Sequence, residues 1–194
     1  EVHTGRMAIN SEARDDRNAC QQTGFCFQGC KWGAKWSTLY TEIPKGEATG
    51  KLEVRPQAHV VKIEHDDSGK VTGVTYADKD GKLNTQKARI VCVAGNTIES
   101  PRLLLNSASE MYPNGLANSS DQVGRNYMRH VTGSVYAVFD KPVRMWRGTT
   151  MAGIVQDEAR HDPARGFVGG YELETLSLGL PFMAAFLDPG QWGR

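Results

Sequence analysis

The chain has 194 residues, which is enough for one sizeable hydrophobic core or two small ones. Its charge is balanced, with 23 Lys and Arg residues against 22 Asp and Glu residues and a net charge of +1. This balance argues against a polyanion-binding protein, which would show a strongly basic face, so we expect no nucleic-acid partner. No apolar stretch is long enough to cross a bilayer, so we expect no direct membrane span.

The N-terminal part of the chain is expected to be poor in regular structure. Residues 1–36 are polar and punctuated by glycine, and they include the cysteine-rich run CQQTGFCFQGC (20–30). The run STLYTEIP (37–44) predicts a short helix with Ser37 as its N-cap and a proline near its end. The run LEVRP (52–56), which follows turn residues, predicts a strand.

Three strand-like runs follow one another and predict a β-meander: HVVKIEHDD (59–67), VTGVTYAD (71–78) and KLNTQKARIVCVAG (82–95). The connections DDSGK and DKDGK carry the Asp and Gly residues that suit tight turns. The last part, IVCVA (90–94), is continuously apolar rather than alternating. It therefore predicts a strand buried on both faces, as in a parallel sheet, with Cys92 as a small core residue.

A glycine and a helix start follow this predicted strand. Gly95 permits a close turn, Ser100 and Pro101 suit a helix start, and the leucines at 103–105 supply a packing face. A strand, a glycine and a helix N-terminus together bring backbone N–H groups toward an anionic ligand at a sheet edge. An ordinary strand-to-helix turn has the same sequence pattern, and both interpretations remain open at this point.

The region beyond the helix alternates between turns and one more predicted strand. Residues 112–130 are rich in turn formers, whereas VTGSVYAVFDKPV (131–143) alternates well enough to predict a strand. We find no internal repeat and no low-complexity tract.

Four segments together resemble one family: GFCFQGCKWGAKWST, HVVKI, RIVCVAGNTIESPRLLLNS and SSDQVGRNYMRH. Their order and approximate spacing are similar to those of the glucose-methanol-choline (GMC) oxidoreductases, FAD enzymes that oxidise alcohol groups. Within the family the chain most resembles the flavoprotein subunit of gluconate 2-dehydrogenase and related sugar and polyol dehydrogenases. One departure is that Ser100-Pro101 lies one residue farther from Gly95 than in the usual family signature.

The resemblance implies an α/β fold for the intact protein and an α+β arrangement for the part that this chain represents. Residues 1–130 would form part of a Rossmann-like FAD-binding domain containing the meander, and residues 131–194 the start of an antiparallel-sheet substrate domain. The Gly-x-Gly-x-x-Gly loop and the catalytic histidine segment of the family have no counterpart here. We therefore expect an internal fragment that is inactive alone, with its catalytic base outside this chain.

The resemblance also implies cofactor contacts on two segments of the predicted FAD domain. The backbone of Val60 would contact the adenine edge, although a β-branched residue in a strand is also a common core residue. Gly95, Asn96 and Thr97 would approach the dinucleotide through backbone groups.

The resemblance also predicts that three further residues lie near the cofactor. Ser37 and Thr38 follow a Gly-Ala-Lys segment that lies beside the cofactor in relatives, with helix capping as the alternative. His130 lies in NYMRH, where the family often has a histidine near the flavin side of the domain boundary; the alternative is a packed, hydrogen-bonded histidine. His65 lies in polar surroundings and is expected to be solvated.

The three clustered cysteines, Cys20, Cys26 and Cys30, allow more than one interpretation. Some sugar dehydrogenases that resemble this chain hold a [3Fe–4S] cluster in this segment, which relays electrons to a cytochrome. Those relatives have a doubled cysteine whose second member corresponds to Gln21 here. Zinc would require a fourth ligand and paired short spacings. We therefore rank free or disulfide-bonded thiols ahead of a cluster, and expect no metal.

For the intact enzyme the resemblance implies hydride transfer from an alcohol group of a sugar, sugar acid or polyol to FAD. Electrons would pass to a separate acceptor such as a cytochrome c subunit, in a periplasmic complex that reaches the membrane through a partner subunit. Two alternatives remain: an alcohol or sterol oxidase of the same family that uses oxygen, and a non-enzymatic thiol-rich binding domain.

Overall fold

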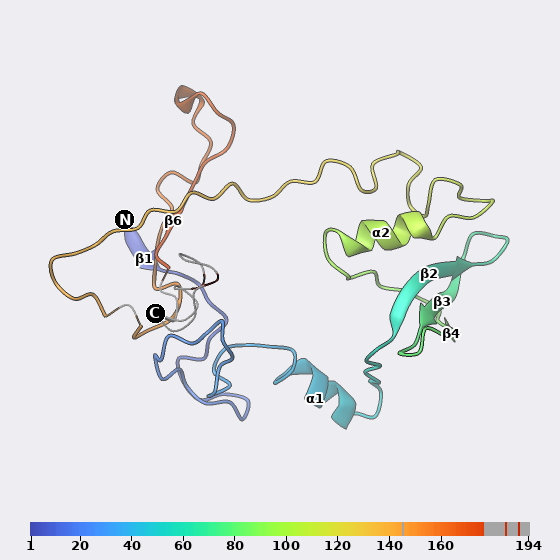
Figure 1. The fold of residues 1–194 in the computed structure, drawn as a ribbon, viewed down its shortest axis with the longest axis horizontal. Helices are drawn as coiled ribbons and strands as arrows, with labels where there is room; N and C mark the ends of the chain where they lie inside the picture. Colours follow the sequence, from blue (N-terminus) through green and yellow to red (C-terminus); the bar gives the residue numbers. More distant parts are fainter. Residues whose placement is uncertain (145, 177–184, 186–189, 191–194) are drawn as a thin grey trace. The chain divides into compact units, whose positions relative to one another are not determined.

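The computed structural model describes residues 1–144, 146–176, 185 and 190, and these divide into two compact units (Figure 1). One unit contains residues 1–53 with the described residues beyond 136, and the other contains residues 54–136. In chain order the elements are β1 (Val2–Thr4), α1 (Glu42–Ala48), β2 (His59–His65), β3 (Val71–Ala77), β4 (Leu83–Lys87), α2 (Glu99–Asn106), β5 (Gly153–Val155), the 3₁₀ helix η1 (Pro163–Arg165) and β6 (Leu173–Glu174).

The predicted meander is confirmed in the unit formed by residues 54–136. Strands β2, β3 and β4 form an antiparallel sheet in that order. The side chain of Asp66 closes the first turn by accepting the N–H groups of Ser68 and Lys70 at 3.0 Å. Asp78 does the same for the second turn. Because each turn is fixed by its own aspartate, the register follows from the local sequence.

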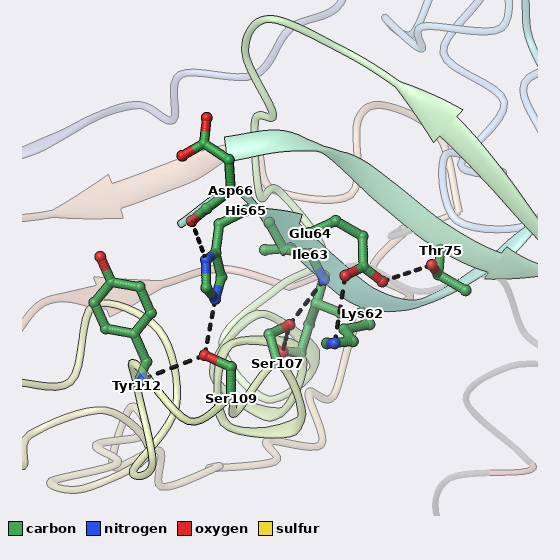
Figure 2. A network of polar contacts seen from close by, with 10 residues as sticks. Lys62, Ile63, Glu64, His65, Asp66, Thr75, Ser107, Ser109 and Tyr112 are labelled. Carbon is green, nitrogen blue, oxygen red and sulfur yellow. Dashed lines mark hydrogen bonds and ion pairs between the residues drawn. The ribbon is translucent and has the colours of Figure 1, made fainter. Parts of the chain in front are cut away.

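The predicted leucine helix is also confirmed, as α2, which packs against β2. The centre of this contact is a buried polar link (Figure 2). Ser107, with 0% of its surface exposed, accepts the N–H of Ile63 at 2.9 Å and donates to Leu103 O at 2.7 Å. Ile63 itself is only 3% exposed. The hydroxyl thus satisfies a strand N–H and a helix carbonyl at the same point.

The other unit has fewer regular elements. A small antiparallel sheet joins β1, β5 and β6 in the order β1-β5-β6. Its described core includes Ala34, Thr150 and Ile154, which are buried. Much of the order in residues 1–36 comes from isolated bridges and from hydrogen bonds between side chains and backbone.

The predicted helix over 37–44 is wrong in its bounds. Residues 37–41 form turns, in which Tyr40 N–H donates to Ser37 O at 3.0 Å, and α1 begins only at Glu42. Pro44 therefore lies in the first turn of the helix and does not end it. This is physically reasonable because first-turn N–H groups have no partner inside the helix, so a proline there forfeits no bond.

Three predicted strands are absent from the described residues: 52–56, 90–94 and 131–143. Ile90 is 81% exposed, and Val131 and Val138 are fully exposed. Cys92 is likewise exposed and is not a core residue. β-branched runs form strands only where a neighbouring strand completes the ladder, and the described chain supplies none at these positions. The prediction of a buried parallel strand is therefore wrong for this structure.

The fold class is confirmed as mixed helices and antiparallel sheets, an α+β arrangement. The division into a cofactor domain at 1–130 and a substrate domain from 131 stays a prediction. No helix in the described part of the chain has the length and apolar character needed to cross a bilayer.

Candidate functional site

The first candidate contact, Val60, lies near the start of β2. In the described part of the chain β2 pairs on one side only, with β3. The register shifts between Val60 and Lys62, so Val61 has no direct partner in the ladder. A bulge of this kind redirects backbone groups away from the sheet. The unpaired side of β2 therefore suits a ligand that reads backbone N–H and C=O groups.

The second candidate segment is the loop Gly95 to Thr97, which is exposed and leads into α2. Asn96 adopts φ 119°, a conformation unusual for a residue with a side chain. The N–H groups of Gly95 and Asn96 both donate to Ser100 Oγ, at 2.9 and 3.2 Å. These are the N–H groups that the resemblance directs at the dinucleotide, and in this structure the Ser100 hydroxyl accepts them.

Sequence reasoning missed the second role of Asn96. Its Oδ1 accepts the N–H groups of Ile98 and Glu99 at 2.8 and 2.9 Å, so its side chain caps the N-terminus of α2. An asparagine three residues before a helical glutamate was the available signal. The cap fixes the loop backbone at the position where a cofactor contact is expected.

The remaining predicted residues lie apart from these two segments in the chain. His130 is exposed in a stretch without regular structure. Ser37 accepts the N–H of Leu39 at 3.3 Å and so stabilises a turn and not a helix. Thr38 is exposed. Since Ser37 and Thr38 belong to the other compact unit, their relation to Val60 stays a prediction.

The three clustered cysteines are brought together. Cys20, Cys26 and Cys30 are free, half-buried thiols that line one small hollow, together with Ile9, Trp32 and Lys35. Among the described residues no group of three His, Cys, Asp or Glu side chains is arranged to hold a metal ion. A [3Fe–4S] cluster is therefore not supported for this chain.

Cys30 has a distinctive electrostatic environment. Its Sγ accepts the N–H of Lys35 at 3.5 Å. Burial raises the pKa of the Cys30 thiol, but backbone N–H groups directed at the sulfur, with that of Lys35 foremost, outweigh the burial. The pKa of Cys30 is consequently lowered from its ordinary value of 9.0, which favours the thiolate.

A second polar cluster, drawn in Figure 2, was not foreseen from sequence. His65 is half-buried and not solvated: its Nδ1 bonds Asp66 O and its Nε2 bonds Ser109 Oγ, both at 2.8 Å. Because a carbonyl only accepts, Nδ1 donates to Asp66 O. Tyr112 stands edge-on to the imidazole with ring centroids 5.0 Å apart. The cluster ties the end of β2 to the chain beyond α2.

The sequence over residues 3–132 matches the GMC oxidoreductase family. This match covers more than half of the chain, and the chain therefore belongs to the GMC oxidoreductases. The predicted membership, made from four short segments, is confirmed.

Individual relatives of the chain include dehydrogenases of a diol, of a sugar and of a sugar acid. It is 34% identical to 2-methyl-1,2-propanediol dehydrogenase of Mycolicibacterium austroafricanum, over 96% of this chain and 35% of the relative. It is 37% identical to the fructose dehydrogenase large subunit of Gluconobacter japonicus, over 64% of this chain and 22% of the relative. It is 29% identical to the gluconate 2-dehydrogenase flavoprotein of Pantoea cypripedii, over 78% of this chain and 26% of the relative. Two oxidases also match.

The chain thus spans about a third or less of the length of the relatives it matches. The family implies FAD, and the residues in 54–136 fit a cofactor held by backbone groups. The unpaired side of β2 and the exposed loop at 95–97 both present main chain. A ligand at β2 would be bound through main-chain groups, as the resemblance predicts for Val60, whereas at the loop it would take the place of Ser100 Oγ as acceptor of the Gly95 and Asn96 N–H groups.

Proposed function

We propose that the intact protein is an FAD-dependent dehydrogenase that oxidises an alcohol group of a polyol, a sugar or a sugar acid. The observation that carries the proposal is the family match over residues 3–132, which covers both backbone segments suited to the cofactor. The printed activities of the three relatives described above support the substrate class: a diol, a ketose and a sugar acid.

In the proposed mechanism the residues of this chain bind and orient the cofactor, and they do not take part in the proton or hydride transfer. When bound, FAD supplies the acceptor for the hydride that leaves the alcohol carbon. The β2 backbone at Val60 holds the adenine end, and the loop Gly95 to Thr97 approaches the dinucleotide with its main chain. Ser37, Thr38 and His130 are proposed to lie near the cofactor. The base that removes the hydroxyl proton lies outside this chain.

The electrons are proposed to leave for a separate acceptor, such as a cytochrome c subunit, in a periplasmic complex held at the membrane by a partner. Two of the relatives are named as a large subunit and as a flavoprotein, which supports a multi-subunit assembly. The second candidate, an oxidase of the same family, is favoured by the two oxidases among the relatives.

The two candidates are separated by the acceptor that reoxidises the flavin. The intact protein is mixed anaerobically with a series of diols, sugars and sugar acids, and loss of the flavin absorbance identifies the substrate. Reoxidation is then followed with an artificial dye and, separately, with oxygen. We expect fast dye reduction and little peroxide. Peroxide formation as fast as dye reduction would favour the oxidase, and a protein that carries no flavin would reject both enzymes in favour of the binding domain.

A further inference from the structure

The hollow lined by Cys20, Cys26 and Cys30 is a cluster of nucleophilic side chains for which the proposed hydride transfer has no use. All three thiols are free and partly accessible. The hollow is also lined by apolar side chains, among them Phe25, and by the positively charged Lys35. Three thiols that share one hollow can react with one another, which dispersed thiols cannot do.

Cys30 is the thiol toward which the backbone N–H groups of one turn, residues 32–35, are directed. After Cys30 the chain reverses at Gly33, which has φ 64°, and Gly33 N–H donates to Cys30 O at 3.0 Å. The reversal directs Lys35 N–H at Cys30 Sγ, with a separation of 3.5 Å. Backbone N–H donors stabilise a thiolate, and the thiolate is the form of cysteine that attacks disulfides.

Cys26 is connected to Cys30 through the same lysine. Lys35 Nζ donates to Cys26 O at 3.0 Å while the backbone of Lys35 contacts the Cys30 sulfur. The Lys35 ammonium also lies 4.8 Å from the centre of the Phe27 ring, a cation–π contact. Cys20, in contrast, has its own local contact, accepting the N–H of Gln22 at 3.3 Å. Cys26 and Cys30 thus both contact Lys35 and line the same hollow, and we take Cys26 as the partner thiol on this ground.

We propose that Cys30 is a site of reversible thiol–disulfide exchange with small disulfides and that Cys26 resolves the product into an internal disulfide. The Cys30 thiolate attacks a low-molecular-weight disulfide RSSR, forming the Cys30–SR bond and releasing RS⁻, which takes up the proton that Cys30 lost. The Cys26 thiol then displaces the second RSH and forms Cys26–Cys30. Two protein thiols are oxidised, one small disulfide is reduced to two thiols, and atoms and electrons balance.

The test uses the intact, fully reduced protein with oxidised glutathione as the probe. Samples are acid-quenched over time, alkylated, and each cysteine is quantified by peptide mass spectrometry. We expect Cys30 to be modified at least about fivefold faster than Cys20 and to end in a Cys26–Cys30 disulfide. In Cys26→Ser the mixed disulfide on Cys30 should accumulate, and in Cys30→Ser the internal disulfide should be lost. Cys20→Ser is the matched control and should behave as the unmodified protein.

Site-resolved rates in the unsubstituted protein keep the test valid even if a variant fails to fold. Modification of Cys20 or Cys26 as fast as Cys30 would overturn the assignment of the attacking thiol. A mixed disulfide on Cys30 that persists in the unsubstituted protein would overturn the role of Cys26. Neither result depends on flavin or on alcohol oxidation, so the outcome is independent of the proposed enzyme function.

Discussion

The meander unit, residues 54–136, and the cysteine-rich segment, residues 1–36, obtain their order in different ways. In the meander, ladder hydrogen bonds, two aspartate turns and one buried serine specify the structure. In the cysteine-rich segment, single side chains such as Arg17 and Lys35 hold loop carbonyls in place. A repeated ladder of hydrogen bonds can be predicted from the sequence, and it does not depend on any one side chain. A segment held by a few single side-chain contacts depends on each of them, and its thiols and backbone groups stay accessible to ligands. Four substitutions, one of them followed over a range of pH, test this difference between the two regions.

The largest effect is expected at Gly73 in β3. A Cβ there would overlap Gln86 O and lie 2.9 Å from Lys87 Cα, so β3 and β4 would have to separate. We expect Gly73→Ala to lower the free energy of unfolding by about 3 kcal/mol. Urea denaturation of the intact protein measures the loss, with Gly133→Ala, where nothing lies within 4 Å, as the control. Equal stabilities of the two variants would contradict the tight β3–β4 contact.

The next effect concerns the buried link between β2 and α2. Ser107→Ala removes the acceptor of the Ile63 N–H and leaves that group buried without a partner. An orphaned buried donor costs about 2 kcal/mol. Hydrogen exchange at the Ile63 amide should quicken along with the loss of stability. Ser120→Ala, at an exposed position, should change neither quantity, and unchanged exchange in Ser107→Ala would disprove the link.

A smaller and more local effect is expected in the cysteine-rich segment. Arg17 donates to the carbonyls of Gly33 and Ala34 at 3.3 and 3.4 Å and to Asn10 Oδ1 at 3.1 Å. Its Nε is buried without a partner among the described residues, which reduces the net benefit of the side chain. We therefore expect Arg17→Met to cost about 1.5 kcal/mol.

The measurement for Arg17→Met is hydrogen exchange of peptides covering residues 8–36. Exchange should quicken there and stay unchanged in the meander. Arg14→Met, which alters an exposed side chain, is the matched control. Faster exchange throughout the protein would show that the two regions are not held independently.

The smallest effect is a pH dependence of the meander. The hydroxyl of Thr75, at 2.7 Å, lowers the pKa of Glu64 from its ordinary value of 4.5; burial opposes this, and Lys62 adds to it. A lowered carboxyl pKa stabilises the folded state above the ordinary value, and this contribution is lost as the pH falls through the folded pKa. Urea midpoints from neutral pH to about pH 3 should therefore fall less steeply in Glu64→Gln than in the unmodified protein. Identical slopes would exclude a contribution from Glu64.

The sequence predicted the parts of the fold that depend on neighbouring residues. Asp66 and Asp78 predict their turns, and the run from Gly95 to the leucines predicts α2. These predictions succeed because turn and helix signals lie within a few residues of the element that they specify. The strands at 90–94 and 131–143 were mispredicted because a strand also needs a partner, which a single segment does not encode.

In the candidate site, too, contacts between residues close in the sequence could be predicted and contacts between distant residues could not. The cysteines meet because they lie within eleven residues of one another, as their spacing suggested. The His65–Ser109 bond joins residues 44 positions apart and gave no signal in the sequence. The capping role of Asn96 was readable from its position before Glu99, but the resemblance drew attention only to its backbone.

If β2 and the loop at 95–97 belong to a flavin-binding protein, the intact protein must contain flavin, and this content can be measured. The protein is purified without added flavin, denatured, and the released cofactor is quantified by absorbance and identified by chromatography. We expect about one FAD per chain. An intact protein that contains no FAD and does not take it up when FAD is supplied would show that these segments do not bind flavin.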